Sequence, residues 1–203
     1  MAERDRRPAT YADLEAVPPH LVAEIVDGVL FTRSHGHAAP AMLRTVLTYL
    51  LRDVTQQRTR PDAPWQIVTL PELHLGKDVL VPEFAAWWVS RMPYLLDEHA
   101  SLTPDWVCEL TSAEVGRNPA LPLKLEIYRQ LGVRHVWTID MTNLSISVTD
   151  NAAQMKPLLS FGKDDLVRAP PFDAISFSLA DLWPLDKPLG FNEDPQALYA
   201  GDR

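Results

Sequence analysis

The sequence predicts an α+β fold: a mixed β-sheet flanked by helices, with N-terminal and C-terminal hairpins. Three observations predict this class. A long amphipathic helix pattern follows Pro40, and short apolar segments of strand length are separated by proline, glycine and polar turns. Asp27-Gly28 separates two further apolar segments, as a hairpin turn does. Helices that cover strands, with hairpins at both ends, are typical of α+β proteins.

Length and composition indicate one folded domain. The 203 residues are 46% apolar and 23% charged, which suits a single sizeable core, and no Gly/Ser linker divides the chain. We expect the domain to span residues 10–185, between a disordered tail (1–9) and a polar C-terminal tail (186–203). No apolar stretch approaches the roughly 20 residues of a membrane span, and no apolar signal-peptide core follows the charged N-terminus. We therefore expect a cytoplasmic protein without a membrane partner.

Charge and cysteine content narrow the function further. A formal net charge of −8 and a pI near 5.2 argue against indiscriminate coating of nucleic acid, although a local basic groove is compatible with both values. Cys108 is the single cysteine, so the chain has no intramolecular disulfide and no CxxC metal site. Because Cys108 lies inside an apolar segment, we expect a buried thiol.

The helices and strands can be placed in order along the chain. Thr10 is expected to cap a short helix, and Ser178 a final helical turn. The helix after Pro40 is expected to cover the sheet through the apolar residues Leu43, Val46, Leu47, Leu50, Leu51 and Val54. A second helix is predicted over 121–131, and strands over 66–70, 72–75, 79–86, 105–110, 136–140, 144–148 and one or two parts of 166–177.

The opposite face of the first long helix carries arginines. Arg44 and Arg52 lie on this face, and Arg58 and Arg60 follow it. These side chains either contact phosphate or form a solvated helix face, and the solvated face is the simpler interpretation.

Two acids continue the apolar faces of predicted strands. Alternation places Glu83 on the face of Val79 and Val81, and Glu109 on the face of Val107. A buried carboxylate is costly unless it is paired or binds a metal. For either acid alone, exposure to water where the strand ends is the simpler interpretation.

A lysine lies on the helix face that should be apolar. Leu121, Lys124, Tyr128 and Leu131 form the stripe that should face the sheet. Lys124 could extend its ammonium to solvent, form a structural ion cluster with the acids, or point over the strands at a phosphate or water. Together, Lys124, Glu83 and Glu109 favour metal-dependent phosphodiester chemistry.

Six short segments add a resemblance to a known family. They are Glu24-Ile25-Val26-Asp27-Gly28, His37, Val81-Pro82-Glu83, the stretch 104–112, Lys124-Leu125-Glu126-Ile127-Tyr128 and the stretch 131–140. In order and spacing they resemble the PD-(D/E)XK nuclease superfamily, in its branch of bacterial restriction endonucleases with a helix-borne lysine. The resemblance runs from about Tyr11 to Trp183 and implies a restriction-endonuclease-like fold.

The resemblance also implies roles for single residues. Glu83 matches the metal-binding aspartate, and Glu109 matches the second metal-binding acid. The lysine usual two residues after that acid is Thr111 here, and Lys124 on the following helix takes its place. Glu24 matches an assisting acid on an early strand. Such enzymes hold Mg²⁺ or Mn²⁺ with two carboxylates, a backbone carbonyl and waters.

The resemblance also implies two residues that support the catalytic site. Tyr128 would position Lys124, and His37 would lie at the rim of the cleft. His35-Gly36-His37 lacks a third metal ligand at a helpful spacing.

The chain departs from the family at two places. The family has Pro-Asp where this chain has Pro82-Glu83, and the arginine-rich loop before the lysine helix is altered at 116–122.

The function expected from the sequence is a Mg²⁺- or Mn²⁺-dependent endonuclease that hydrolyses DNA phosphodiester bonds. Glu24, Glu83, Glu109 and Lys124 would be its catalytic residues, with metal at Glu83 and Glu109. A homodimer is an open alternative to a monomer, because double-strand cutting needs two sites. The Glu83 substitution, the altered loop and the acidic charge favour a different class: a nuclease-fold protein with weakened or no cleavage that serves as a nucleic-acid-binding or assembly module.

Overall fold

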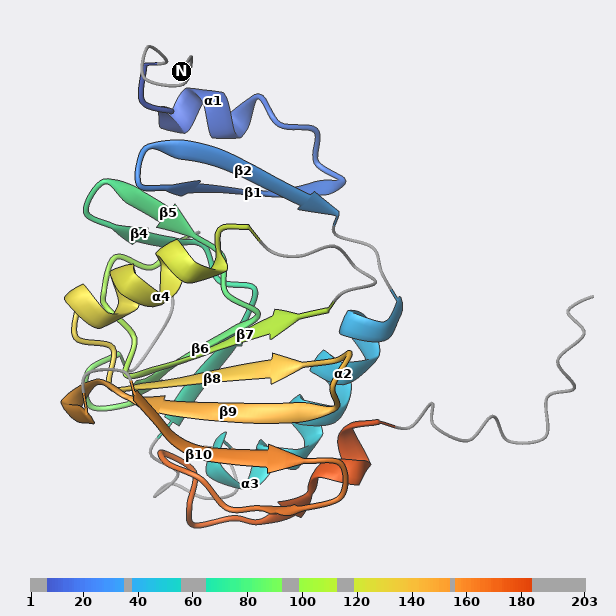
Figure 1. The fold of residues 1–203 in the computed structure, drawn as a ribbon. Helices are drawn as coiled ribbons and strands as arrows, with labels where there is room; N and C mark the ends of the chain where they lie inside the picture. The colour runs from blue at the N-terminus through green and yellow to red at the C-terminus, as the bar shows by residue number, and fades with distance from the viewer. Residues whose placement is uncertain are drawn as a thin grey trace, which may run out of the picture.

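A computed structural model describes residues 7–34, 38–55, 65–92, 99–112, 119–153 and 156–183. These residues form a small four-stranded sheet and a larger six-stranded sheet, with helices on both faces of the larger one (Figure 1). The predicted mixed α+β class is therefore confirmed. Most of the two predicted tails lies outside the described residues.

The N-terminal part folds as the turn chemistry predicts. Helix α1 (Tyr11–Glu15) begins after Thr10, whose backbone N–H and hydroxyl both donate to the Asp13 carboxylate at 2.8 Å. Strands β1 (Leu21–Val26) and β2 (Val29–Ser34) then form the predicted antiparallel hairpin. Its turn residues have positive φ angles, 50° at Asp27 and 77° at Gly28, which this tight turn requires.

The predicted strand over 79–86 is wrong as one element. The structure divides it into β5 (Asp78–Leu80) and β6 (Phe84–Trp88), which belong to different sheets. The break falls at Val81-Pro82-Glu83, because Pro82 has no N–H to give to a ladder. Strand β5 pairs with β4 (Leu73–Leu75) and, at Ile25–Val79, with β1, which gives the small sheet the order β2-β1-β5-β4.

The larger sheet has the order β10-β9-β8-β7-β6-β3. All its neighbouring strands are antiparallel except β7 and β8, which are parallel and joined through helix α4 (Leu121–Gln130). Its strands are β3 (Trp65–Thr69), β6, β7 (Trp106–Thr111), β8 (His135–Asp140), β9 (Ser145–Asp150) and β10 (Lys156–Gly162).

Strand β10 was not predicted from the sequence. Its neighbouring residues Leu158 and Leu159 are both exposed, so the segment lacks the alternation that marks a half-buried strand. Beyond it, β11 (Leu166–Val167) and β12 (Phe177–Ser178) form a short antiparallel pair where one or two strands were expected. The 3₁₀ helix η2 (Leu179–Leu182) follows Ser178, and another, η1 (Asn151–Ala153), follows β9.

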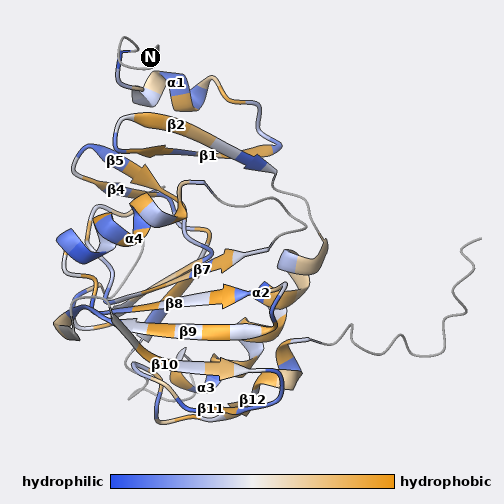
Figure 2. Ribbon diagram, viewed as in Figure 1, coloured by the Kyte–Doolittle hydropathy of each residue, from blue (hydrophilic) through white to orange (hydrophobic). Residues whose placement is uncertain are grey.

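Helices cover opposite faces of the larger sheet (Figure 1). Helix α2 (Ala38–Leu50) starts two residues before the predicted Pro40, which the first helical turn tolerates, and α3 (Arg52–Thr55) continues after Leu51. Helix α4 lies on the other face, near the small sheet, and Figure 2 shows its mixture of polar and apolar residues. Among the described residues, no helix is long and apolar enough to span a membrane.

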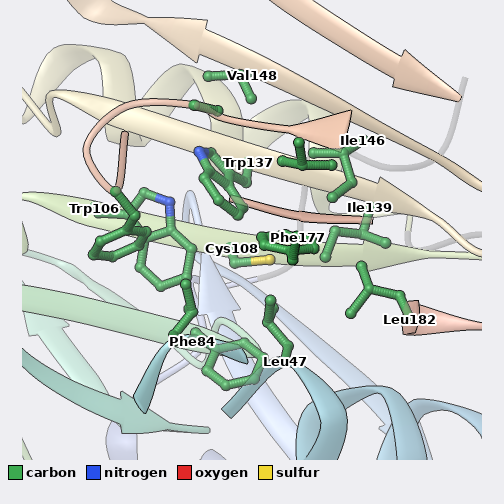
Figure 3. Close-up of a cluster of buried hydrophobic side chains, with 14 of the residues drawn as sticks. Leu47, Phe84, Trp106, Cys108, Trp137, Ile139, Ile146, Val148, Phe177 and Leu182 are labelled. Atoms are coloured by element: carbon green, nitrogen blue, oxygen red, sulfur yellow. The ribbon is translucent and has the colours of Figure 1, made fainter. Parts of the chain in front are cut away.

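The main core lies between the larger sheet, α2 and the C-terminal strands (Figure 3). Trp106, Trp137 and Phe172 pack edge to face, with ring centroids 4.9 to 5.7 Å apart. Cys108 is buried beside them, as expected, and burial raises the pKa of its thiol well above the ordinary value. A second apolar cluster lies between the sheet, α4 and the small sheet, and includes Leu80 and Trp87.

We expect Leu47→Ala to lower the free energy of unfolding by about 2–5 kcal/mol, because Leu47 is fully buried between α2 and the sheet. Leu166→Ala is the matched control: Leu166 is 67% exposed, so the change should stay within about 0.5 kcal/mol. Urea denaturation of both variants measures the difference. Equal losses in the two variants would contradict this placement of the core.

Candidate active site

Lys124 lies at the centre of a buried ionic group. It is fully buried on the sheet-facing side of α4. Its Nζ lies 2.6 Å from Glu24 Oε1 and 2.7 Å from Glu109 Oε1. The interpretation in which Lys124 extends its ammonium to solvent is therefore wrong, and the sequence prediction that it faces the sheet is right.

Three elements bring this group together. Glu24 comes from β1 in the small sheet, Glu109 from β7 in the large sheet, and Lys124 from α4 between them. Tyr128, one turn after Lys124 on the same helix face, donates its hydroxyl to Glu109 Oε1 at 2.7 Å. Glu24 Oε1 also accepts the Val81 backbone N–H at 2.7 Å, which ties the acid to the break between β5 and β6.

Glu83 is also buried, and two arginines hold it. Arg33 Nη1 lies 2.9 Å from Glu83 Oε1, and Arg44 Nη1 lies 2.6 Å from Glu83 Oε2. Arg33 comes from β2 and Arg44 from α2. The interpretation of Arg44 as part of a solvated face is wrong, because only 13% of its side chain is exposed.

Arg33 was missed in the sequence, although a pattern could have identified it. In β2, alternation places Arg33 on the same face as Phe31, which packs against the second apolar cluster. The same argument had identified Glu109 on its strand. Arg33 thus continues an apolar strand face, which indicates a charged residue with a buried partner. The identity of that partner was not apparent, because Glu83 is 50 positions away in sequence.

The two groups meet at one backbone carbonyl. Val81 O accepts a hydrogen bond from Lys124 Nζ at 3.4 Å and another from Arg33 Nη2 at 3.3 Å. We call the joined set the ionic cluster: Glu24, Glu83, Glu109, Arg33, Arg44 and Lys124. Its three carboxylates face three cations, so their formal charges cancel.

Burial and the neighbouring charges shift the pKa values inside the cluster. Burial, helped by Glu24, raises the pKa of Glu109 above its ordinary value, although Lys124 and Tyr128 oppose this shift. Burial lowers the pKa of Lys124, but Glu109 and Glu24 together outweigh burial and raise it. Burial, followed by Glu109, raises the pKa of Tyr128 well above its ordinary value. Lys124 is therefore a cation at neutral pH, and Tyr128 a neutral donor.

The donor atoms of the cluster suit a hard divalent cation. Carboxylate oxygens are the ligands that Mg²⁺ prefers, and Mg²⁺ needs few of them because it keeps several waters. Glu83 precedes Phe84, which pairs with Cys108 next to Glu109, so the two predicted metal ligands lie at the same end of β6 and β7. Within the described residues, no group of three or more His, Cys, Asp and Glu forms a ready-made metal site.

Two sequence-predicted features lie outside the described residues. One is His37, the expected supporting residue at the cleft rim, and the other is the pair Arg58 and Arg60. The altered loop is described only from Pro119, and α4 begins at Leu121, so Pro122 lies in its first turn, where proline is tolerated.

Comparison with known proteins bears on the fold. No protein-family model and no curated protein matches the chain. Among solved structures, the chain is similar to a crystal structure from Anabaena variabilis described as a putative nuclease belonging to DUF820. The two have 17% sequence identity and a TM-score of 0.71, and the match covers 87% of this chain and 98% of that one. The two proteins share a fold.

We expect Lys124→Met to lower the free energy of unfolding by about 3–5 kcal/mol, because it leaves Glu24 and Glu109 buried without their shared cation. Lys77→Met is the matched control. Lys77 is an exposed lysine paired with Asp27, so its loss should leave the free energy of unfolding nearly unchanged. Urea denaturation at pH 7.5 measures both. A Lys124→Met protein as stable as the wild type, or more stable, would contradict the prediction.

The difference in stability between wild type and Lys124→Met should depend on pH. Because the folded-state pKa of Lys124 is raised, its stabilisation is fully present below the ordinary lysine pKa of about 10.4 and is lost as the pH rises through the folded-state value. The stability difference between wild type and Lys124→Met should therefore narrow above about pH 10.4.

Proposed function

We propose that this protein is a metal-dependent nuclease that hydrolyses DNA phosphodiester bonds with Mg²⁺ or Mn²⁺. One observation carries the proposal: a fully buried lysine on α4 is bound to carboxylates from two different sheets, next to a third buried carboxylate at the β5–β6 break. The resemblance to the PD-(D/E)XK superfamily, matched at Glu24, Glu83, Glu109 and Lys124, and the shared fold with a protein described as a putative nuclease support it.

Glu83 and Glu109 would hold the metal, which when bound polarises the phosphate and lowers the pKa of an attacking water. The contacts of Glu109 with Lys124 and Tyr128 both use Oε1, so Oε2 would be the oxygen that holds the metal. Lys124, a cation with a raised pKa, would stabilise through its charge the negative charge that develops on the phosphate. Tyr128 holds Glu109 in place, and Glu24 holds Lys124.

Cleavage of DNA tests the proposal directly. The purified chain should cut duplex DNA in Mg²⁺ or Mn²⁺ and lose this activity in chelator. Glu109→Gln should lower the rate by about a hundredfold or more, because it removes a charged ligand from the site. Glu126→Gln is the matched control, since Glu126 is exposed on α4 and pairs with Arg129. A chain that binds no divalent metal and cleaves neither DNA nor RNA in either ion would overturn the proposal.

A second function is favoured by the environment of Glu83. Both of its carboxylate oxygens contact arginines, so a metal has to replace a close ion pair before it can bind there. In this alternative the chain is a nuclease-fold protein with weakened or no cleavage that binds nucleic acid or assembles with a partner.

Glu83→Asp separates the two functions. The shorter side chain draws the carboxylate back by about 1.5 Å, to the length usual in the resembled family, and away from Arg33 and Arg44. If the chain is a weakened nuclease, Glu83→Asp should raise the cleavage rate by about tenfold or more, because misplacement by about 1 Å is worth up to a hundredfold. Calorimetric Mg²⁺ titration accompanies the assay. If neither the wild type nor Glu83→Asp binds Mg²⁺, the second function, a nucleic-acid-binding or assembly protein, is favoured.

A further inference from the structure

The cations of the ionic cluster differ in their access to solvent. Lys124 is fully buried, whereas 28% of the Arg33 side chain and 13% of the Arg44 side chain are exposed. A phosphate that approaches from solvent can therefore reach the two arginines before it can reach the lysine. Arginine is also the side chain best suited to a phosphate, because its planar guanidinium offers five donors in a fixed fork.

In the described structure both arginines bind the carboxylate of Glu83. Arg44 contacts Glu83 through Nη1, and Arg33 contacts Glu83 through Nη1 and the Val81 carbonyl through Nη2. Each guanidinium therefore has donors beyond those used on Glu83. The backbone contact gives Arg33 a second anchor, so Arg33 can stay near the site when its carboxylate partner changes.

Glu83 is costly to release from this ion pair alone, because only 6% of its side chain is exposed. A buried carboxylate that loses its cation becomes an uncompensated buried charge, which is strongly unfavourable. Glu83 is therefore expected to leave the arginines only for another cation, and the arginines, which solvent reaches only in part, leave Glu83 most readily for another anion. A divalent cation and a phosphodiester together satisfy both conditions, and they are the two ligands of a metal-dependent nuclease.

We propose that Arg33 and Arg44 are the phosphate-binding residues of this site, and that they exchange Glu83 for a DNA phosphate when a divalent cation binds Glu83. The inference rests on the proposed nuclease function for the identity of its ligands. Its consequence is cooperative binding: a bound metal favours DNA binding at the site, and bound DNA favours metal binding. By thermodynamic linkage, the metal strengthens DNA binding by the same factor by which DNA strengthens metal binding.

Wild-type protein provides the first test. Binding of a fluorescein-labelled 12-base-pair DNA duplex is followed by anisotropy at 4 °C in Mg²⁺ and in chelator, at matched ionic strength, with gels to confirm that the duplex stays intact. We expect DNA to bind at least about fivefold more tightly with Mg²⁺, the lower end of typical coupling between sites. Equal DNA affinity with and without Mg²⁺ would overturn the exchange without the need for any variant.

Variants test whether Arg33 and Arg44 carry the coupling between metal binding and DNA binding. Arg33→Met/Arg44→Met frees Glu83, so we expect this protein, without DNA, to bind Mn²⁺ at least about fivefold more tightly than the wild type, as counted from free Mn²⁺ by electron paramagnetic resonance. Its affinity for DNA should fall. The slope of log affinity against log salt concentration should become shallower by the amount that corresponds to about two lost phosphate contacts. Unchanged Mn²⁺ and DNA affinities would overturn the proposal.

Two controls separate competition at Glu83 from a general charge effect. Arg129→Met/Arg134→Met removes the same total charge from exposed ion pairs on and after α4, and should leave Mn²⁺ affinity unchanged. With Glu83→Gln also present, the Arg33 and Arg44 substitutions should no longer tighten Mn²⁺ binding. Tightening that persists without the Glu83 carboxylate would overturn competition. Circular dichroism confirms the fold of each variant.

The outcomes distinguish this inference from the proposed function. Coupled binding of metal and DNA without cleavage would uphold the exchange and overturn the nuclease. Cleavage in Mg²⁺ without coupling, and without any effect of Arg33 and Arg44 on Mn²⁺ affinity, would uphold the nuclease and overturn the exchange.

Discussion

A lysine with no exposed surface is the constraint on which this structure depends. Lys124 can remain charged inside the protein only because Glu24 and Glu109 lie within 2.7 Å of its ammonium. These acids belong to different sheets, so the pairing fixes the small sheet against the large one, with α4 between them. The second apolar cluster packs around the same junction, so the polar group and its apolar surroundings specify one arrangement.

The same constraint gives the site its chemical character. Three acids and three cations cancel in formal charge, which makes the cluster acceptable in a buried place. A divalent cation alone would disturb this balance, and so would a phosphate alone. Arg33 and Arg44 both contact the Glu83 carboxylate, and the two proposed functions differ in whether a metal would replace these arginines there.

Much of the site could be predicted because its residues break local patterns. Glu109 continues an apolar strand face, and Lys124 occupies an apolar helix stripe, so each is conspicuous within a few residues of sequence. The arginines were harder. Arg44 lies on a helix face that the pattern assigns to solvent, but it is largely buried and binds Glu83, 39 positions later. Similarly, β10 has no alternation because it is an edge strand with exposed leucines, and pairing with β9 alone makes it a strand.

The sequence by itself determined the local elements: the Asp27-Gly28 hairpin, the amphipathic helix that became α2 and α3, the helix that carries Lys124, and the mixed α+β class. These depend on backbone preferences and periodicity within short windows. Only the tertiary structure decided that 79–86 divides between two sheets at Pro82, and which acid pairs with which cation. Ion pairing depends on distances of a few ångströms between residues far apart in sequence, and no local pattern encodes those distances.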